Sequence, residues 1–374
     1  MAGHDEVEWM ARAHALAARA LLLSDPNPRV GCVLVRDGQI VGEGWTHRPG
    51  GVHAEVCAIQ AAGSAGRGAT AYVTLEPCAH IGRTGACTEA LIQAGVAEVV
   101  YAVEDPNPQV SGAGAEALRE AGIQVRRDAF GLNSAVHNPG YFRRWSEGLP
   151  WVRLKTAASL DGRTALADGS SRWITGSEAR QDVQFWRARS SAVLTGIGTV
   201  LADDPQLNVR LGGDYYGDEE APQPLRVILD SQRRTPPAAR ILGLPGRVLL
   251  AHIEGAAQPP AFELDDHVEA AAYPAAAGDG GGIDLERLLR DLARRGCNEV
   301  HVEAGATLAG ALLAGGWVDE WIHYTAPTVL GSDAAPLAHL PGLQTLDEAP
   351  RWQLLSVMMV GADARLLMRR GRTQ

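Results

Sequence analysis

Hydrophobic positions in the N-terminal third of the chain alternate between the helical and the strand period. Residues 5–23 have apolar positions at helical spacing and end before the turn-forming stretch SDPNPRVG. The runs VGCVLV and QIVGEGW, joined through Asp37-Gly38, predict a β-hairpin. HAEVCAIQAA and ACTEALIQAG predict helices, ATAYVTLEP and AEVVYAV predict strands, and AEALREAGIQVRR predicts a helix followed by a strand. This alternation is typical of a helix-flanked sheet with parallel pairings.

The periodicity breaks at residues 131–150, GLNSAVHNPGYFRRWSEGLP, so we expect a domain boundary near the end of this stretch. The expected domains are residues 1–148 and 149–374. WVRLKTAAS opens a second α/β pattern, with strands predicted at AVLTGI, LRVILD, RVLLAH, EVHVEAG and EWIHYTAP. Two segments predict exposed insertions, the acidic residues 212–224 and the Ala/Pro/Gly-rich residues 254–282.

Composition narrows the protein class. A chain of 374 residues with 46% hydrophobic but only 5% aromatic residues fits an Ala/Leu/Val-rich soluble α/β enzyme of two domains. It begins with acidic residues instead of a basic and then apolar leader, and no apolar run reaches the ~20 residues of a membrane span. We therefore expect a cytoplasmic protein. The net charge of −10 gives no support to broad nucleic-acid or membrane binding.

The five cysteines and a repeated turn are the next features of interest. An odd cysteine count without a secretory leader argues against a disulfide framework, and Cys32, Cys57 and Cys297 are interpreted as buried small hydrophobes. The tetrapeptide DPNP occurs at residues 25–28 and again at 105–108. We interpret these as two similar rigid turns, because a structural repeat would extend over a longer window.

Cys78 and Cys87, with eight residues between them, are candidate metal ligands together with His53 at a predicted helix start. His, Cys and Cys suit zinc, and three protein ligands leave a fourth position for water, whose pKa zinc lowers from ~16 to about 7. Glu55 lies about 200° around the helix from His53, so both should not bind the metal. Glu55 can instead carry a proton from that water to a departing amine.

The order His-x-Glu, then Pro-Cys and a second Cys, is the pattern of zinc-dependent nucleobase deaminases, in which only two residues separate the cysteines. Cys87 would open a helix, where its thiolate is favoured by the helix N-terminus. Taken singly, HAE is more often a solvated helix start, and loop cysteines are more often inert. A structural zinc would need a fourth ligand, for which His80 is the nearest candidate.

The stretches DPNPRVGCVLV, GEGWTHRPGGVHAE, LEPCAHIGRTGAC and EDPNP, in this order, resemble one deaminase family. It is the family of bifunctional riboflavin-biosynthesis diaminohydroxyphosphoribosylaminopyrimidine deaminases/5-amino-6-(5-phosphoribosylamino)uracil reductases. The resemblance continues through KTAASLDGRTA, SRWITG, TVLADDPQLNVR, VILDSQ, VEAGATLAGALL and APTVLG, and so covers nearly the whole chain. The wide cysteine spacing is normal in this family, which favours zinc ligation by both cysteines.

The resemblance implies a three-layer α/β/α domain similar to cytidine deaminases, followed by an α/β domain similar to dihydrofolate reductase. It implies one zinc ion, held by His53, Cys78 and Cys87, with Glu55 as the proton carrier. Pyrimidine-pocket residues implied by the resemblance are Asn27, His47, Glu76 and His80. In the second domain it implies NADPH near Ala157, Trp173, Thr199, Asp203, Ser231, Gly305, Ala306, Thr307, Leu308, Ala309, Gly310 and Ala311. The implied substrate side consists of Ser171, Arg187, Leu207, Arg210 and Glu303.

Physical reasoning agrees in part with these implied roles. VEAGATLAG predicts a strand, a glycine turn and a helix, whose N–H groups and dipole can receive a phosphate. Arg187 and Arg210 can donate charge-assisted hydrogen bonds to a substrate phosphate. In this motif Ala306 stands where many relatives are expected to have Pro.

The implied chemistry is two consecutive steps on one phosphorylated pyrimidine. Zinc-bound hydroxide would displace an exocyclic amine, and NADPH would then deliver hydride to C1′ of the ribosyl group and open it to a ribityl chain. Lys155, Asp203 and Glu303 are candidate acids for the second step. The resemblance also implies a homo-oligomer, either dimer or tetramer.

Two other classes compete with this interpretation. An RNA-editing deaminase of the tRNA adenosine type would need a basic face and the short cysteine spacing, and the sequence has neither. A zinc-stabilised binding module without catalysis would have no need of Glu55. Ammonia release from the phosphorylated pyrimidine would separate these classes.

Overall fold

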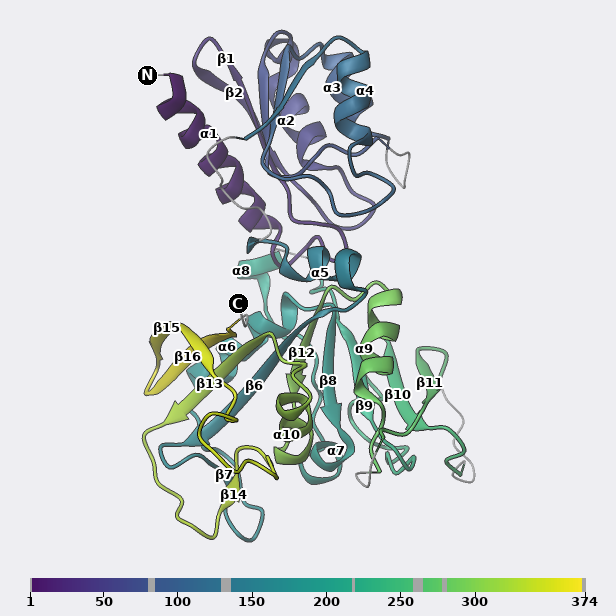
Figure 1. The fold of residues 1–374 in the computed structure, drawn as a ribbon, viewed down its shortest axis with the longest axis vertical. Coiled ribbons are helices and arrows are strands. Elements are labelled where there is room, and N and C mark those ends of the chain that lie inside the picture. The colour runs from purple at the N-terminus through teal and green to yellow at the C-terminus, as the bar shows by residue number, and fades with distance from the viewer. Residues whose placement is uncertain are drawn as a thin grey trace. The chain divides into compact units, whose positions relative to one another are not determined.

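The computed structural model describes residues 2–79, 85–128, 136–216, 219–257, 265–277 and 281–371. Its contacts divide the chain into two compact units, Met1–Gly148 and Leu149–Gln374 (Figure 1). Each unit has its own sheet and its own hydrophobic core, as expected for independently packed domains.

The first unit contains a five-stranded sheet in the order β2-β1-β3-β4-β5. Antiparallel pairing joins β1 to both β2 and β3, whereas β3, β4 and β5 run parallel. The strands are β1 (Gly31–Arg36), β2 (Gln39–Trp45), β3 (Thr70–Val73), β4 (Glu98–Tyr101) and β5 (Gln124–Arg127). The helices are α1 (Ala2–Ala17), η1 (Ala18–Ala20), α2 (Ala54–Ala62), η2 (Gly63–Gly66), α3 (Cys87–Ala94), α4 (Ala113–Glu120) and α5 (Pro139–Glu147).

Alternating side chains of β1 bury both faces of this sheet and so create three layers. Cys32 and Leu34 pack in a core with residues of α2, α3 and α4. Val33 and Val35 point to the opposite face and pack with α1. A strand buried on both faces is a nearly continuous apolar run, which is the pattern of VGCVLV.

Gly44 on β2 allows α2 to approach the sheet closely. A Cβ atom at position 44 would lie only 2.2 Å from the carbonyl oxygen of Ala54. Ala54 is the first residue of α2 and stands between His53 and Glu55. The glycine therefore fixes the position of the helix N-terminus that carries the proposed zinc chemistry.

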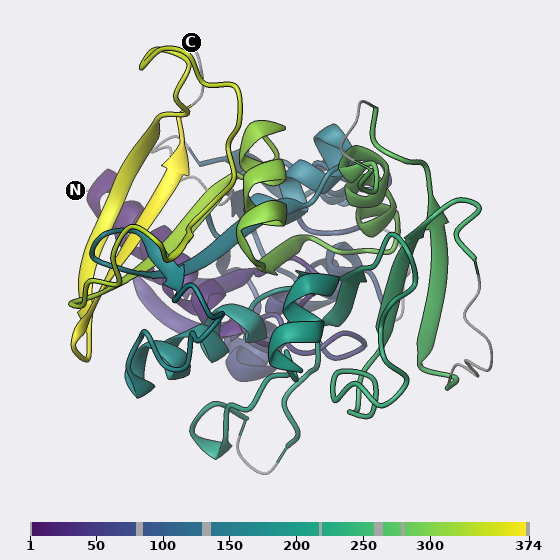
Figure 2. The same cartoon turned by 90° about the horizontal axis from the view of Figure 1, so that it is seen from below.

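The second unit contains a nine-stranded sheet in the order β11-β10-β9-β8-β12-β6-β13-β16-β15. The first seven of these strands are parallel, and an antiparallel hairpin, β15–β16, completes one edge (Figure 2). The strands are β6 (Trp151–Ser159), β8 (Ala192–Gly196), β9 (Leu225–Leu229), β10 (Val248–Ile253), β11 (Val268–Tyr273), β12 (Glu299–Glu303), β13 (Glu320–Ala326), β15 (Trp352–Val360) and β16 (Asp363–Arg370). A separate small sheet pairs β7 (Arg163–Ala165) with β14 (Ala335–Pro336).

Helices cover both faces of the large sheet. The helices of this unit are α6 (Ser177–Ala188), α7 (Ile197–Asp203), α8 (Gly213–Tyr216), α9 (Leu285–Arg294) and α10 (Ala306–Ala314). On one face, Val300 and Val302 of β12 pack in a core with α9 and α10. On the other face, α6 packs on Ile322 and Tyr324 of β13.

A row of buried charges separates α6 from the middle of the sheet. Arg153 is fully buried and forms ion pairs with Glu299 at 2.9 Å and Glu320 at 2.6 Å. Its guanidinium also lies 5.0 Å from the ring centroid of Trp186 on α6. The paired carboxylates compensate the cost of removing the guanidinium from water.

The predicted mixed α/β fold class and the strands named from the sequence are confirmed. The prediction that residues 254–282 form only an exposed insertion is wrong, because β11 lies within it and pairs with β10. Val268 and Tyr273 of β11 are 8% and 5% exposed. Within residues 212–224, Tyr216 of α8 is also buried, although most neighbouring described residues are exposed. In the described part of the chain, every helix is too short or too polar to span a membrane.

Candidate functional site

Three segments of the first unit bring the predicted metal ligands together. His53 is the N-cap residue of α2, with extended backbone, and Cys87 is the first residue of α3. Cys78 lies in the loop that follows β3, and its carbonyl oxygen accepts a hydrogen bond from the backbone N–H of Thr88. Two helix N-termini therefore lie beside the cysteine sulfur atoms, where they favour negative charge.

The spacing of the three donor atoms suits a zinc ion. His53 Nδ1 lies 3.1 Å from Cys87 Sγ and 3.8 Å from Cys78 Sγ, and the three donor atoms all lie within 4.8 Å of one another. A tetrahedral zinc ion, with bonds of about 2.1 Å to nitrogen and about 2.3 Å to sulfur, separates such donors by about 3.6 Å. Hydrogen bonds from Cys87 and His53 lower the pKa of Cys78 to about 4, which favours the metal-binding thiolate.

Glu55 stands beside this donor cluster without being one of its members. Its side chain is only 4% exposed, and burial, followed by the charge of Cys78, raises its pKa to about 7. A carboxyl group with this pKa can both accept and release a proton near neutral pH. The arrangement therefore offers three candidate metal donors and one candidate proton carrier.

A cavity of about 390 Å³ opens beside the four residues. This volume is within the usual range for small-molecule sites. Its wall contains these four residues and residues of both DPNP turns. The lining residues are Pro26, Asn27, Pro28, Val30, Thr46, Pro49, Gly50, His53, Glu55, Leu75, Glu76, Cys78, Cys87, Asp105, Asn107, Val110, Tyr141, Arg144 and Trp145.

Of the four predicted pyrimidine-pocket residues, the structure places two on the cavity wall. Asn27 and Glu76 line the cavity, whereas His47 is exposed and is not among the lining residues. The His47 ring instead stacks on Trp45 at 5.6 Å. His80 lies outside the described residues.

The Glu76 carboxylate is held by the backbone. It accepts hydrogen bonds from the N–H groups of Asp105 at 3.3 Å, Gly112 at 3.1 Å and Ala115 at 3.1 Å. Gly112 is the N-cap of α4 and has no side chain that could cap the helix. Glu76 thus caps α4 from a distant part of the sequence, while it also forms part of the cavity wall.

Asp105 and Tyr141 form a second polar pair on the cavity wall that sequence reasoning did not identify. The Tyr141 hydroxyl donates to Asp105 Oδ1 at 3.0 Å, and burial raises the pKa of Asp105 to about 6. The Asp105 carboxylate also accepts the N–H of Asn107 at 2.8 Å. The recurrence of DPNP was the sequence signal that could have identified Asp105, because residues of both copies line the same cavity.

In the second unit, β12 leads through Gly305 into α10, as the sequence predicts. Gly305 has open space around it, and Thr307 and Ala311 are exposed, whereas Ala306 and Leu308 are half-buried. Ala309 is fully buried, and a Cβ at Gly310 would meet the carbonyl oxygen of His339. Gly305, Thr307 and Ala311 of the predicted cofactor segment are therefore accessible, whereas Ala309 and Gly310 are packed against other parts of the unit.

The other predicted cofactor residues come from separate elements. Ala157 is half-buried on β6, Thr199 is half-buried on α7, and Ser231 follows β9. Trp173 is 69% exposed, and the Arg180 guanidinium lies 4.4 Å from its ring centroid. Asp203 ends α7 and accepts a hydrogen bond from Arg172 through its backbone oxygen at 2.7 Å.

Some of the predicted substrate residues are buried or bonded to other residues of the unit, and others are accessible to a ligand. Arg187 is 8% exposed and makes two hydrogen bonds to Glu303, at 2.5 and 3.0 Å, and a third to the Asn208 carbonyl oxygen. Leu207 is buried in the core, whereas Ser171 is half-buried. Arg210 is exposed, and its guanidinium donates hydrogen bonds to the side-chain oxygens of Gln206 and Asn208.

Lys155 is the single lysine in a chain with 33 arginines. It lies on β6 opposite Glu303 of the neighbouring strand, and its amine is 5.9 Å from the ring centroid of Tyr324. Burial lowers the pKa of Lys155. An arginine cannot release a proton at physiological pH, whereas a buried lysine can, so Lys155 is a candidate for proton transfer.

Each of the two units matches the model of a known protein family. Residues 150–366 match the model of the RibD C-terminal domain, and residues 4–103 match the cytidine and deoxycytidylate deaminase zinc-binding region. The riboflavin biosynthesis protein RibD of Escherichia coli is 47% identical over 361 residues, which cover 95% of this chain and 96% of that protein. The chain belongs to the RibD family. The family resemblance predicted from the sequence motifs is therefore confirmed.

Solved RibD structures share the fold over nearly the entire chain. Acinetobacter baumannii RibD is 45% identical, with a TM-score of 0.90, and the match covers 99% of this chain and 100% of that one. A Thermotoga maritima diaminohydroxyphosphoribosylaminopyrimidine deaminase/5-amino-6-(5-phosphoribosylamino)uracil reductase is 34% identical, with a TM-score of 0.83 and the same coverage. The chain is thus an enzyme with a deaminase domain and a reductase domain, as members of the RibD family are. The zinc-binding region matched by the deaminase model includes His53, Glu55, Cys78 and Cys87.

Proposed function

We propose that the chain catalyses two consecutive steps of riboflavin biosynthesis. The first is deamination of 2,5-diamino-6-(5-phosphoribosylamino)pyrimidin-4(3H)-one. The second is NADPH-dependent reduction of the ribosyl group of 5-amino-6-(5-phosphoribosylamino)uracil to ribityl. The observation that carries the deaminase half is the His53, Cys78 and Cys87 donor cluster with Glu55 beside it on one cavity wall.

In the deaminase unit, His53, Cys78 and Cys87 would hold the zinc ion. Zinc supplies a Lewis acid that activates water and stabilises the developing negative charge. Glu55 accepts the proton released when water adds to the ring carbon, and passes it to the amine nitrogen that leaves as ammonia. Burial raises the pKa of Glu55, which suits a group that both accepts and releases a proton.

In the reductase unit, the open turn at Gly305 and the N-terminus of α10 would receive a phosphate of NADPH. NADPH supplies the hydride that is transferred to C1′ of the substrate. The exposed guanidinium of Arg210 is suited to the substrate phosphate, whereas that of Arg187 is engaged by Glu303. We therefore assign Arg187 to orienting Glu303.

Lys155 is the best-supported proton donor for the reduction. The ribosyl ring oxygen leaves C1′ as the hydride arrives, and it needs a proton. Glu303 is unsuited to this role, because Arg187 and His301 hold its pKa well below the usual range despite burial. The hydrogen bond recorded for Asp203 uses its backbone oxygen, whereas Lys155 lies on β6 opposite Glu303 of the proposed substrate side.

The two activities are tested by product analysis. Purified protein incubated with the diaminopyrimidinone phosphate should release one ammonia per substrate without NADPH, and with NADPH it should give the ribityl product, as identified by mass spectrometry. Deamination of a tRNA anticodon stem in place of the pyrimidine would instead support the RNA-editing class. A zinc-loaded protein that is inactive on both would support the binding-module class.

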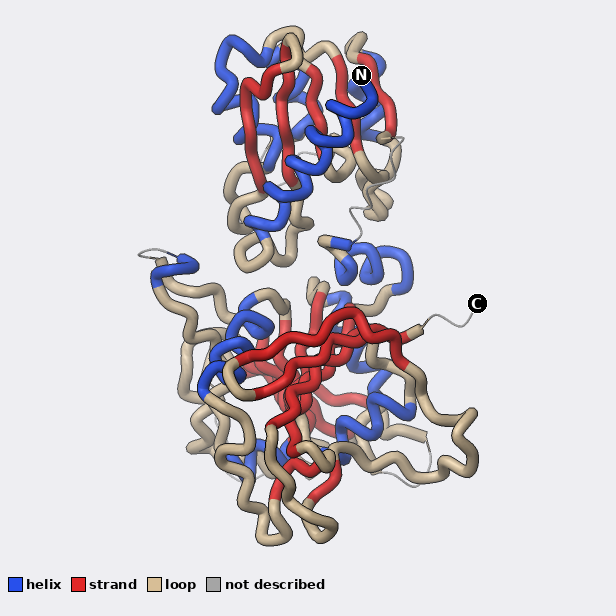
Figure 3. The backbone as a smooth tube through the Cα atoms, turned by 90° about the vertical axis from the view of Figure 1, so that its left-hand side faces the viewer, coloured by secondary structure: helices blue, strands red, loops and turns tan. Residues whose placement is uncertain are grey.

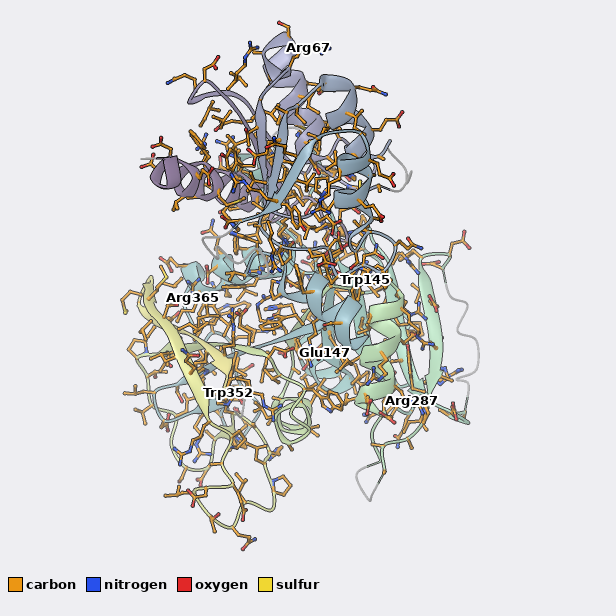
Figure 4. The ribbon with its side chains drawn as sticks, turned by 45° about the horizontal axis from the view of Figure 1, so that its top comes forward. Arg67, Trp145, Glu147, Arg287, Trp352 and Arg365 are labelled. Carbon is orange, nitrogen blue, oxygen red and sulfur yellow. The ribbon has the colours of Figure 1, made fainter. Side chains whose placement is uncertain are left out.

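We further propose that the RibD-type reductase unit associates with a second copy of the chain through β15 and β16. Leu354, Val357 and Met359 share one face of β15, and are 54%, 57% and 68% exposed. Figure 3 shows the hairpin in front of the rest of this unit, and Figure 4 labels Trp352 and Arg365 on it. An unpaired edge strand with exposed apolar side chains can pair antiparallel with its own copy about a two-fold axis.

A contiguous exposed apolar patch on an edge strand is typical of a protein–protein interaction site. Val357→Lys should therefore shift the protein toward the monomer in light scattering. Leu346→Lys, at a residue 84% exposed in a separate loop, is the matched control and should keep the wild-type mass. A wild-type protein that is monomeric at micromolar concentration would refute the proposed association.

A further inference from the structure

Arg144 is a cation on the cavity wall to which no role has been assigned so far. It is one of the described lining residues and is the only arginine or lysine among them. It lies on α5, the helix on which Figure 4 labels Trp145 and Glu147. Tyr141, Arg144 and Trp145 are spaced three and four residues apart, so they lie on one face of the helix.

The guanidinium of Arg144 has no carboxylate partner among the residues that the structure describes. Its contacts are the faces of two aromatic rings, with centroids 5.8 Å away in Tyr141 and 5.1 Å away in Trp145. Its Nε atom is buried and lacks a hydrogen-bond partner within the described part of the chain. An unpaired and partly desolvated cation costs free energy in the ligand-free protein, and a bound anion would offset this cost.

The carboxyl groups on the described cavity wall are already engaged. Glu76 accepts three backbone N–H groups, and Asp105 accepts the Tyr141 hydroxyl and the Asn107 N–H. Glu55 lies at the zinc donors. All three are acidic, so without Arg144 the described wall of the cavity would repel an anionic substrate.

We propose that Arg144 binds the phosphate group of the deaminase substrate and selects the phosphorylated pyrimidine over its dephosphorylated form. This proposal rests on the proposed deaminase function. A phosphate monoester carries about −1.5 to −2 charges at pH 7 and offers oxygen acceptors that match the fork of a guanidinium. The zinc donors would then position the amine-bearing ring, and Arg144 would hold the other end of the same molecule.

Hydrogen bonds and core packing hold α5, and with it Arg144, in place within the first unit. Asn138, the residue before α5, accepts the Arg29 N–H at 2.7 Å and donates to the Arg29 carbonyl oxygen at 2.9 Å. Tyr141 is buried in the core on which the sheet and α2 also pack. Arg143, next to Arg144, forms an ion pair with Glu147 and is not one of the cavity-lining residues.

The test compares Arg144→Gln with wild type on two substrates, the diaminopyrimidinone riboside with and without its 5′-phosphate, by ammonia release without NADPH. For the phosphorylated compound, kcat/KM should fall about 10- to 100-fold, mainly through KM, as expected for loss of hydrogen bonds to a charged group. For the dephosphorylated compound it should change less than about twofold. Arg144→Lys should restore part of the loss, and inorganic phosphate should inhibit wild type more than Arg144→Gln.

Arg143→Gln is the matched control and should behave as wild type on both compounds. Zinc content and the reductase KM for 5-amino-6-(5-phosphoribosylamino)uracil report whether the variant is intact, and both should be unchanged. Equal losses of Arg144→Gln on the two compounds, or full activity on the phosphorylated one, would overturn the proposal while leaving the deaminase function standing. Absence of ammonia release by wild type from either compound would overturn the deaminase function itself, and this proposal with it.

Discussion

Replacement of Glu55 by Gln is expected to lower the rate of deamination by about 10²- to 10⁴-fold. Gln keeps the size and hydrogen-bonding shape of the side chain but cannot carry a proton between water and the leaving amine. Because Glu55 stands outside the His53, Cys78 and Cys87 donor cluster, zinc should stay bound at one ion per chain. Ammonia release and metal analysis of the same preparation measure both quantities.

The NADPH-dependent reduction should be unaffected in Glu55→Gln when 5-amino-6-(5-phosphoribosylamino)uracil is supplied directly. Glu89→Gln provides a matched control, because Glu89 is an exposed carboxylate in the first turn of α3 whose partner is the side chain of Gln93. It should retain deamination. Loss of zinc from Glu55→Gln would contradict the placement of Glu55 outside the metal ligands.

Replacement of Lys155 by Met should lower the kcat of reduction by about 10²- to 10⁴-fold, a loss similar to that of deamination in Glu55→Gln. Ammonia release should be unchanged. Met has a comparable length and apolar stem but cannot donate a proton to the departing ring oxygen. Lys155→Arg distinguishes a role of the positive charge from a role in proton transfer. Arginine keeps the charge but does not release its proton at any accessible pH. NADPH oxidation measured with the second substrate gives kcat and KM for both variants.

The pH dependence of wild-type reduction gives an independent check on Lys155. Burial lowers the pKa of this amine from the usual 10.5, so its donating, protonated form is lost at a lower pH than in an exposed lysine. The kcat of reduction should therefore fall as pH rises through a value below 10.5. If Lys155→Arg retains the wild-type kcat, the residue acts only as a charge, and proton donation by it is refuted.

The deaminase chemistry could be predicted from sequence because its parts lie at the ends of regular elements. The position of His53 before a helix, and of Cys87 at the start of another, follows from periodicity and capping rules. Motif order then implied the ligand set, and the structure brings the three donors together. The regular strands of the second unit were predicted for the same reason.

What could not be predicted depends on partners that are distant in sequence. Arg153 looks like an ordinary strand-end charge in WVRLK, yet it is buried between Glu299 and Glu320, which come from two other strands. The residues of β11 were assigned to an insertion because their Ala-rich composition resembles a loop, whereas pairing with β10 decides their conformation. The engagement of Arg187 by Glu303 is likewise a tertiary contact.

The position of Glu76 changes how defects at this residue should be interpreted. A substitution there would release the first turn of α4, and Gly114 of that turn packs so closely on Pro77 that a Cβ would lie 1.8 Å from its carbonyl oxygen. Pro77 directly precedes Cys78, so loss of this packing would reach the proposed metal ligand through a single peptide unit. A Glu76 variant with slow deamination could therefore have lost the support of α4 and not a contact with the substrate. Kinetic measurements alone would not distinguish these two causes.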